Sequence, residues 1–79
     1  MGMEDAPLSA IVEMICRVGG IPGLAPNQDF YDAGVSSVNA LPLLLEIEDR
    51  FQVTVPDDRF IAARTAESIH ALIHDLRRA

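Results

Sequence analysis

The fold is decided by the stretch Ser37-Val38-Asn39-Ala40-Leu41-Pro42-Leu43-Leu44-Leu45-Glu46-Ile47-Glu48-Asp49-Arg50-Phe51. Its apolar side chains return every three or four residues, which is the spacing of one face of an amphipathic helix. The expected apolar stripe consists of Val38, Leu41, Leu44, Leu45 and Phe51, broadened by Leu43 and Ile47. Ser36 or Ser37 begins this helix. Pro42 lacks the amide hydrogen that would bond the Val38 carbonyl, so we predict a kink there, because the stripe continues beyond it.

The segment before this stretch predicts a first helix and a long loop. The helix is indicated by apolar residues at helical spacing, and these are Leu8, Ile11, Val12, Ile15 and Val18. Gly19-Gly20 ends it. The loop runs from Ile21 to Val35, and a loop of that length needs anchors on the helices. We expect the anchors to be Leu24, Phe30 and Tyr31.

The segment after the stretch predicts a short helix and a long one. Pro56 and Asp57 open the short helix, which continues through Phe60 and Ile61. Thr65 is expected to cap the last helix, whose apolar stripe is Ile69, Leu72, Ile73 and Leu76. The pattern therefore predicts an all-α bundle of three main helices plus one short helix, with a long loop between the first two helices.

The whole chain, residues 1–79, is expected to form a single domain. Hydrophobic residues make up 49% of it but aromatic ones only 5%, so aliphatic side chains must build the core, which suits packed helices. A chain this small has no room for a two-lobed substrate pocket, and a conventional enzyme is not expected. Met1-Gly2 is interpreted as a remnant of cloning ahead of a native Met3. The short lead before the first helix favours a stand-alone protein over a module of a longer chain.

The net charge of −6 disfavours nucleic acid and anionic membrane surfaces as partners. All six basic residues are Arg. The segment from Asp29 to Asp58 contains seven acidic residues and a single basic residue, Arg50. This acidic middle is either a docking surface for basic partners or a solvated face that keeps a small protein in solution.

Cys16 is the single cysteine, so no internal disulfide can form, which fits the reducing cytoplasm. It lies within an apolar helical pattern, and we expect a buried structural thiol rather than a nucleophile. The chain has no apolar run long enough to span a membrane and no signal-peptide pattern at its N-terminus. A cytoplasmic monomer is the expectation.

Two hydroxyls stand where the loop meets the second helix, in the run Gly34-Val35-Ser36-Ser37-Val38. One interpretation is structural, with Ser36 capping the helix and Ser37 following it. The other is that one hydroxyl carries a phosphodiester, since the start of a helix stabilises phosphate through free amides and the positive end of the dipole. Hydrolase chemistry is not indicated, because the closing Gly of a nucleophile elbow and a nearby His are both absent.

The segment from Phe30 to Ile73 resembles the acyl carrier protein family of phosphopantetheine-binding proteins. The resemblance rests on Gly34-Val35-Ser36-Ser37-Val38, on Leu44-Leu45-Glu46-Ile47-Glu48-Asp49-Arg50-Phe51 and on Val53-Thr54-Val55-Pro56-Asp57. It implies an acyl-carrier-like bundle in which Ser37 carries a covalent 4'-phosphopantetheine arm. The arm's thiol would hold acyl-type groups as thioesters, while partner enzymes supply the catalytic groups.

The resemblance also implies a docking surface and a set of partners. The expected partner-binding residues are Ser36, Val38, Leu41, Glu46, Glu48, Asp49, Asp57 and Asp58. Expected partners are a phosphopantetheinyl transferase, an acyl- or aminoacyl-loading ligase, and downstream transferases or synthases with basic surfaces. The pathway stays open among fatty-acid, polyketide, peptide and related biosynthesis.

The sequence departs from the family pattern at the start of the second helix. Ser36 stands where the family usually has Asp, and Asn39 and Pro42 stand where acids are common. This neutral start suggests a dedicated partner set, and an aminoacyl carrier charged by its own ligase is one alternative. An acidic helical interaction module that carries no arm is the alternative of another class.

A metal site is not expected. His70 and His74 lie one helical turn apart, with Glu67 near by, but no further ligand joins them. Asp57 and Asp58 with Asp29 and Asp32 could hold a cation loosely, although they lack the spacing of a calcium loop.

Overall fold

Residues 7–78, the part of the chain that this computed structural model describes, contain four α-helices and one short 3-10 turn. The helices are α1 (Leu8–Gly19), α2 (Ala40–Phe51), α3 (Asp57–Ala62) and α4 (Ala66–Arg78), and the turn η2 (Ser37–Asn39) leads directly into α2. No strand occurs within these residues. The predicted all-α bundle of three main helices and one short helix is confirmed. The interpretation of Met1-Gly2 concerns residues outside the described part.

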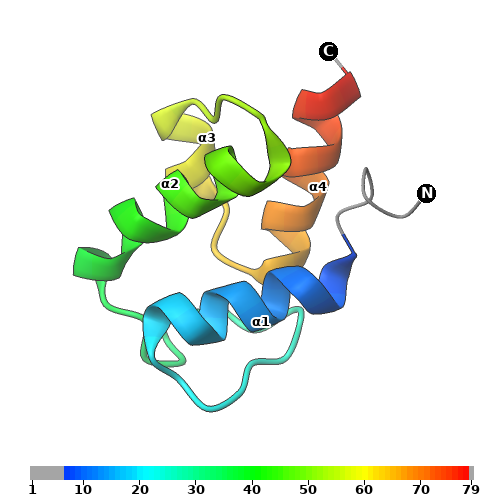
Figure 1. Cartoon of the computed structure of the whole chain (residues 1–79). Coiled ribbons are helices and arrows are strands. Elements are labelled where there is room, and N and C mark those ends of the chain that lie inside the picture. The colour runs from blue at the N-terminus through cyan, green and yellow to red at the C-terminus, as the bar shows by residue number, and fades with distance from the viewer. Residues whose placement is uncertain (1–6, 79) are drawn as a thin grey trace.

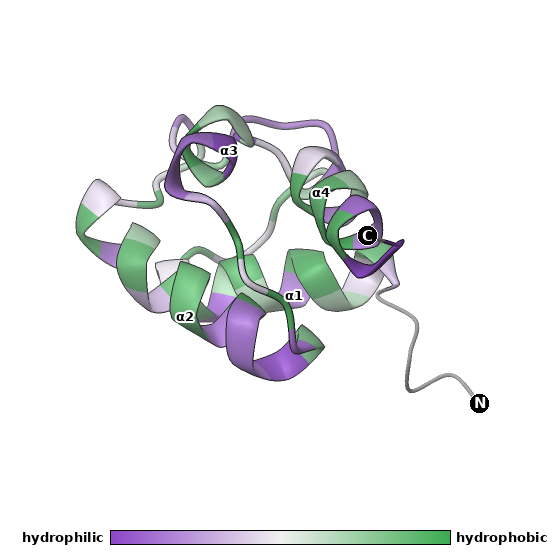
Figure 2. Cartoon of the chain, turned by 90° about the horizontal axis from the view of Figure 1, so that it is seen from above, coloured by the Kyte–Doolittle hydropathy of each residue, from purple (hydrophilic) through white to green (hydrophobic). Residues whose placement is uncertain are grey.

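The core lies where α1, α2 and α4 meet, with α3 closing one side (Figure 1). Each long helix contributes three or four side chains that are almost fully removed from solvent. They are Ile11, Met14 and Ile15 of α1, Leu43, Leu44, Ile47 and Phe51 of α2, and Ala66, Ile69, Leu72 and Ile73 of α4. No polar side chain is buried among the described residues. Apolar and polar bands alternate along the helices, as amphipathic packing requires (Figure 2).

The long loop between α1 and η2 is anchored by Phe30, whose side chain is completely buried. The Phe30 amide donates a hydrogen bond of 2.9 Å to the carbonyl of Arg64, in the linker between α3 and α4. Leu24 and Tyr31 are half-buried and pack against the same core. All three predicted anchors are therefore confirmed, and the loop is tied to the α3–α4 linker.

The predicted apolar stripe of α2 was wrong in part. Leu44 and Phe51 are buried, together with Leu43 and Ile47, but three other members of the stripe point to solvent. The exposed fractions are 79% for Val38, 61% for Leu41 and 54% for Leu45. Leu41 and Leu45 are four residues apart, as are Leu43 and Ile47, so each pair fits helical spacing on its own face. Periodicity alone could not tell which face would meet α1.

The predicted kink at Pro42 is replaced by a different arrangement. The α-helix begins at Ala40, not at Ser36 or Ser37, so Pro42 is its third residue. The first amides of an α-helix have no intrahelical acceptor, and a missing N–H there costs little. The Val38 carbonyl, which Pro42 would have approached in a longer helix, belongs to η2. The 3-10 turn thus places the proline where a helix tolerates it.

The other helix ends follow the sequence closely. Gly20 has φ +70° and ends α1, and the Thr65 hydroxyl accepts a hydrogen bond of 3.0 Å from the Ser68 amide at the start of α4.

Cys16 corrects one expectation, because its side chain is half-buried rather than buried. None of the helices within residues 7–78 could cross a lipid bilayer.

Candidate functional site

The two hydroxyls at the start of η2 have different surroundings. Ser36 is extended, with φ −75° and ψ 148°, and its Oγ accepts a hydrogen bond of 3.1 Å from the Val38 amide. Ser36 is therefore the cap of η2. Ser37 is the first residue of the turn and is exposed, and its hydroxyl makes no hydrogen bond to any described residue. The capping role falls on one serine, which leaves the other hydroxyl accessible.

The backbone before these serines is held firmly. Val35 is 4% exposed, and its amide donates a hydrogen bond of 2.9 Å to the Phe30 carbonyl. Gly34 adopts φ +121°, a conformation that only glycine reaches without strain, and turns the chain from the loop into Val35. Ser37 therefore follows a fixed loop-to-helix junction.

A hollow of about 310 Å³ opens beside Ser37, between the loop, the start of α2, and α3. Its lining is mainly apolar, and it includes two polar residues, Ser37 and Asp57. The lining residues are Tyr31, Ser37, Ala40, Leu41, Leu44, Asp57, Phe60 and Ile61. A broader groove of about 760 Å³ between α3 and α4 does not include Ser37.

Four large apolar side chains near this hollow face solvent, and we call them the apolar patch. They are Val38, Leu41, Leu45 and Ile61, and Ile61 is 67% exposed. Leu41 and Ile61 belong to both the patch and the lining of the hollow. The patch includes Val38 and Leu41, the two apolar residues predicted to contact partners.

The acidic residues predicted to bind partners divide into two groups. Glu46 forms an ion pair with Arg17 of α1, and the carboxylate of Glu48 accepts a hydrogen bond of 2.9 Å from the Val55 amide.

Asp49, Asp57 and Asp58 are exposed, and the last two occupy the first turn of α3. Carboxylates there are stabilised by the helix dipole. Of these acids, Asp57 shares the lining of the hollow with Ser37.

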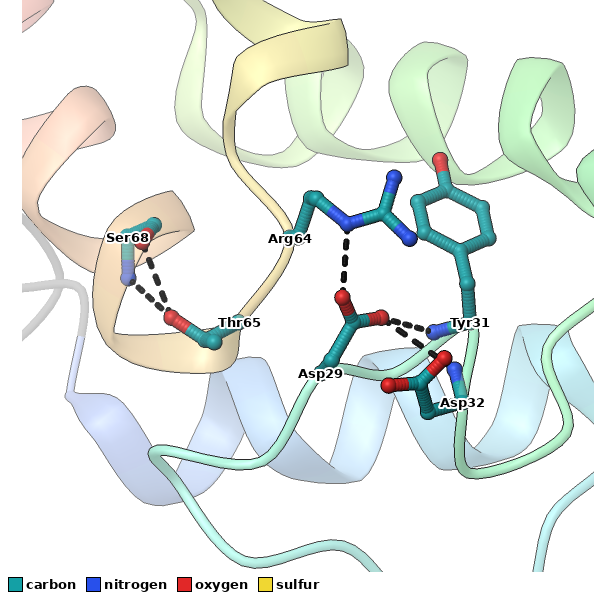
Figure 3. Close-up of polar contacts among 6 residues, drawn as sticks. All are labelled: Asp29, Tyr31, Asp32, Arg64, Thr65 and Ser68. Atoms are coloured by element: carbon teal, nitrogen blue, oxygen red, sulfur yellow. Dashed lines mark hydrogen bonds and ion pairs between the residues drawn. The ribbon is translucent and has the colours of Figure 1, made fainter.

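A cluster that the sequence did not suggest holds the loop against the α3–α4 linker (Figure 3). One carboxylate oxygen of Asp29 accepts hydrogen bonds from the amides of Tyr31, at 2.9 Å, and Asp32, at 3.2 Å. The other accepts a hydrogen bond of 2.6 Å from Nε of Arg64. The guanidinium of Arg64 also lies over the Tyr31 ring, 4.9 Å from its centroid. The hydrogen bond from Arg64, helped by those from the backbone, lowers the pKa of Asp29.

Comparison with known proteins identifies this arrangement. A family model described as "Phosphopantetheine attachment site" matches residues 9–73. The chain belongs to this family of carrier proteins. A "Probable acyl carrier protein" of Caulobacter vibrioides (strain NA1000 / CB15N) is 37% identical over 46 residues, which are 58% of this chain and 54% of that protein. The chain spans about half the length of this curated relative. No solved structure matches the chain significantly.

The resemblance to the acyl carrier protein family is thereby confirmed. The family's members are carriers rather than enzymes, and they hold a covalently attached 4'-phosphopantetheine. They interact with a phosphopantetheinyl transferase and with biosynthetic enzymes. The structure fits such an arm, because the hydroxyl of exposed Ser37, which has no hydrogen-bond partner in the described part of the chain, stands at a firm junction beside a hollow.

The His and Asp residues that the sequence offered as metal ligands do not form a metal site in the described part of the chain. The rings of His70 and His74 lie 4.6 Å apart, centroid to centroid, on α4. In residues 7–78 no three metal-ligating side chains are grouped, so Asp29 and Asp32 do not join Asp57 and Asp58 around a cation. The Asp29 carboxylate is instead engaged by Arg64. An arginine isolated between two helices has no local pattern, and for that reason the sequence did not single it out.

Proposed function

We propose that this chain carries acyl-type groups on a 4'-phosphopantetheine arm attached to Ser37 and presents them to partner enzymes. The thiol of such an arm holds its cargo as a thioester. The observation that supports Ser37 is the contrast with Ser36: the Ser36 hydroxyl caps η2, whereas Ser37 is exposed and its hydroxyl makes no hydrogen bond within residues 7–78. Fatty-acid, polyketide, peptide and related biosynthesis all use carriers of this kind.

The chain's own residues position and shelter the arm rather than react. Val35 and the Gly34 turn fix the direction in which Ser37 leaves the loop. The hollow offers apolar walls to the arm or to a short apolar cargo, because six of its lining side chains are hydrocarbon or aromatic. The family's members are carriers rather than enzymes, so the partner supplies the catalytic groups that act on the carried group.

Intact mass tests the assignment. Co-expression with a broad-specificity phosphopantetheinyl transferase should add one arm to the wild-type chain and to Ser36→Ala, but none to Ser37→Ala. Ser36→Ala loses a cap and should lower the free energy of unfolding by ~1 kcal/mol. Loading of Ser37→Ala but not of Ser36→Ala would place the arm on Ser36. An unchanged mass for all three proteins would favour an acidic interaction module that carries no arm.

We further propose that partners dock on the apolar patch and on the acids of α3. Val38 and Leu41 flank the first turns after Ser37 and present hydrocarbon to solvent. Asp57 and Asp58 supply negative charge on the facing helix, and Asp49 supplies it at the far end of α2.

Glu46 and Glu48 add less, because Arg17 and the Val55 amide already engage their carboxylates. A partner with an apolar contact surface edged by basic residues is complementary to this face.

This distribution of charge also favours a dedicated set of partners. The start of the second helix carries no acid, since Ser36, Asn39 and Pro42 are neutral, and the Glu46 charge is compensated by Arg17. Electrostatic steering toward a strongly basic enzyme is correspondingly weaker beside Ser37. An amino-acid ligase that loads this carrier is the alternative that such a surface supports. The test is to incubate the protein that carries a free arm with candidate ligases, each supplied with its amino or fatty acid. The increase in intact mass then shows which class of cargo was attached.

A further inference from the structure

Tyr31 is the side chain through which the loop between α1 and η2 reaches the hollow. Its ring lines the hollow together with Ser37, and its body packs against the core. On one side lies the buried ring of Phe30, 4.7 Å away between centroids and tilted by 50°. On another side lies the guanidinium of Arg64, 4.9 Å from the ring centroid. The Tyr31 ring is therefore held between Phe30, which is buried, and Arg64, which is exposed.

Arg64 is in turn held by Asp29. The Nε of Arg64 donates to Asp29 at 2.6 Å, while the second carboxylate oxygen accepts from the Tyr31 amide at 2.9 Å. Asp29 thus fixes both the backbone of Tyr31 and the side chain that covers the Tyr31 ring, as Figure 3 shows. The contact joins residues 35 positions apart in the chain. A planar guanidinium suits this role, since it can make the hydrogen bond at its edge and stack with its face.

We propose that Arg64 is a positioning residue that holds the Tyr31 ring as a wall of the hollow beside Ser37, with Asp29 as its anchor. The inference rests on the proposed function, in which a group attached at Ser37 can lie in the hollow. With Arg64 in place the ring stays beside the hollow and an apolar cargo is sheltered. Without it the ring samples other positions, and the hollow shelters cargo less well. Arg64 is not itself among the residues that line the hollow, and it contacts the lining through the Tyr31 ring.

A test on the unmodified protein uses the ring itself. Tyr31 is the only tyrosine and the chain has no tryptophan, so intrinsic fluorescence reports this one ring. Acrylamide quenching measures how often the ring is open to solvent. A cation–π contact at an exposed site shifts an equilibrium by about two- to fivefold, so Arg64→Ala should raise the quenching constant within that range. Arg64→Lys keeps the charge but not the planar stack, and should give an intermediate value.

The matched control is Arg59→Ala. Arg59 is another exposed arginine in an ion pair, at 2.8 Å to Asp75, but the guanidinium over the Tyr31 ring is that of Arg64. Arg59→Ala should leave the quenching constant unchanged. Circular dichroism checks that each variant keeps its helices, and Asp29→Asn offers a second way to release Arg64 while an amide oxygen remains for the backbone bonds.

The loaded protein supplies the second measurement. Acetyl and octanoyl thioesters on the arm are cleaved with hydroxylamine, and intact mass of the same sample counts the arms. Arg64→Ala should speed octanoyl cleavage by about the same two- to fivefold factor. It should leave acetyl cleavage as in the wild type, because the acetyl group offers the ring much less apolar surface than the octanoyl chain does. Equal quenching and equal octanoyl cleavage in Arg64→Ala and wild type, with full loading, would overturn the positioning role while the carrier function stands. Absence of an arm on every protein, with the quenching still changed, would instead overturn the carrier function.

Discussion

Gly19 of α1 lies so close to Val35 that no larger residue fits between them: a Cβ atom at Gly19 would be 2.6 Å from a methyl carbon of Val35. Real Cβ atoms do not approach other carbons at that distance, so a side chain at residue 19 must displace Val35. Val35 is buried two residues before Ser37. The end of α1 therefore sets the position of the junction that presents Ser37.

We predict that Gly19→Ala lowers the free energy of unfolding by about 1–3 kcal/mol, the usual cost of overpacking a core. Urea unfolding followed by circular dichroism measures it. The matched control is Gly23→Ala, because a Cβ there meets nothing within 4 Å and the backbone needs no positive φ. In a Val35→Ala background the cost of Gly19→Ala should shrink, since the clashing methyl groups are gone. Equal stability of Gly19→Ala and wild type would contradict the close approach.

The Asp29 carboxylate predicts a pH dependence of stability. Its pKa is lowered below the ordinary value of 3.8, chiefly by the hydrogen bond from Arg64. A carboxylate with a depressed folded-state pKa stabilises the fold above the unfolded value, and that contribution is lost as pH falls through the folded value. Asp29→Asn should therefore be less stable than wild type at neutral pH, with the difference shrinking in acid below pH 3.8. Urea midpoints across this range test it. Arg64→Ala should remove most of the same pH dependence, and a difference that grows in acid would contradict the assignment.

Pro42 tests where α2 begins. If Pro42 lay in a helix interior, its replacement by Ala would stabilise the protein by about 3 kcal/mol. In the first turn of α2 the missing amide has no acceptor to lose, so Pro42→Ala should instead be neutral or slightly destabilising, by about 0.4–1 kcal/mol, through the freer unfolded chain. Thermal unfolding distinguishes the two. A large gain in stability would show that the helix extends back through Ser37.

The apolar patch should matter for partners and not for folding. Leu41 and Leu45 are 61% and 54% exposed, so Leu41→Ser and Leu45→Ser should change stability by less than about 1 kcal/mol. Each should lower the rate at which a partner enzyme uses the loaded carrier. Ala71→Ser, on the exposed side of α4, is the control. Unchanged partner rates in both variants would remove the patch from the docking surface.

The neutral helix start predicts a specialised carrier. When this protein with its arm competes with a typical acidic carrier, fatty-acid-synthase enzymes should use it at the lower rate. Ser36→Asp keeps a capping oxygen and adds one charge next to Ser37, and should recover part of the loss. Equal use of both carriers would mean that the neutral start has no functional consequence.

Local patterns in the sequence were sufficient for the order and approximate bounds of the helices. Gly20 and Thr65 end and begin helices through their own backbone or hydroxyl, so their effect can be read from neighbouring residues. The buried anchor Phe30 was also predictable, because a long loop must return to the core. The Gly-aliphatic-Ser-Ser run, with its downstream motifs, was enough to suggest the carrier family before any packing was known.

Tertiary structure decided what periodicity leaves ambiguous. Leu41 and Leu45 fit helical spacing as well as Leu43 and Ile47 do, and only the position of α1 buries one face and exposes the other. The same holds for charge: Glu46 and Asp58 look alike in sequence, but one meets Arg17 across two helices and the other stays in solvent. Asp29, Tyr31 and Arg64 come together only because the loop and the α3–α4 linker pack side by side. Helical periodicity is a property of neighbouring residues, whereas contacts between distant residues depend on how the helices pack, and these contacts decide the surroundings of Ser37.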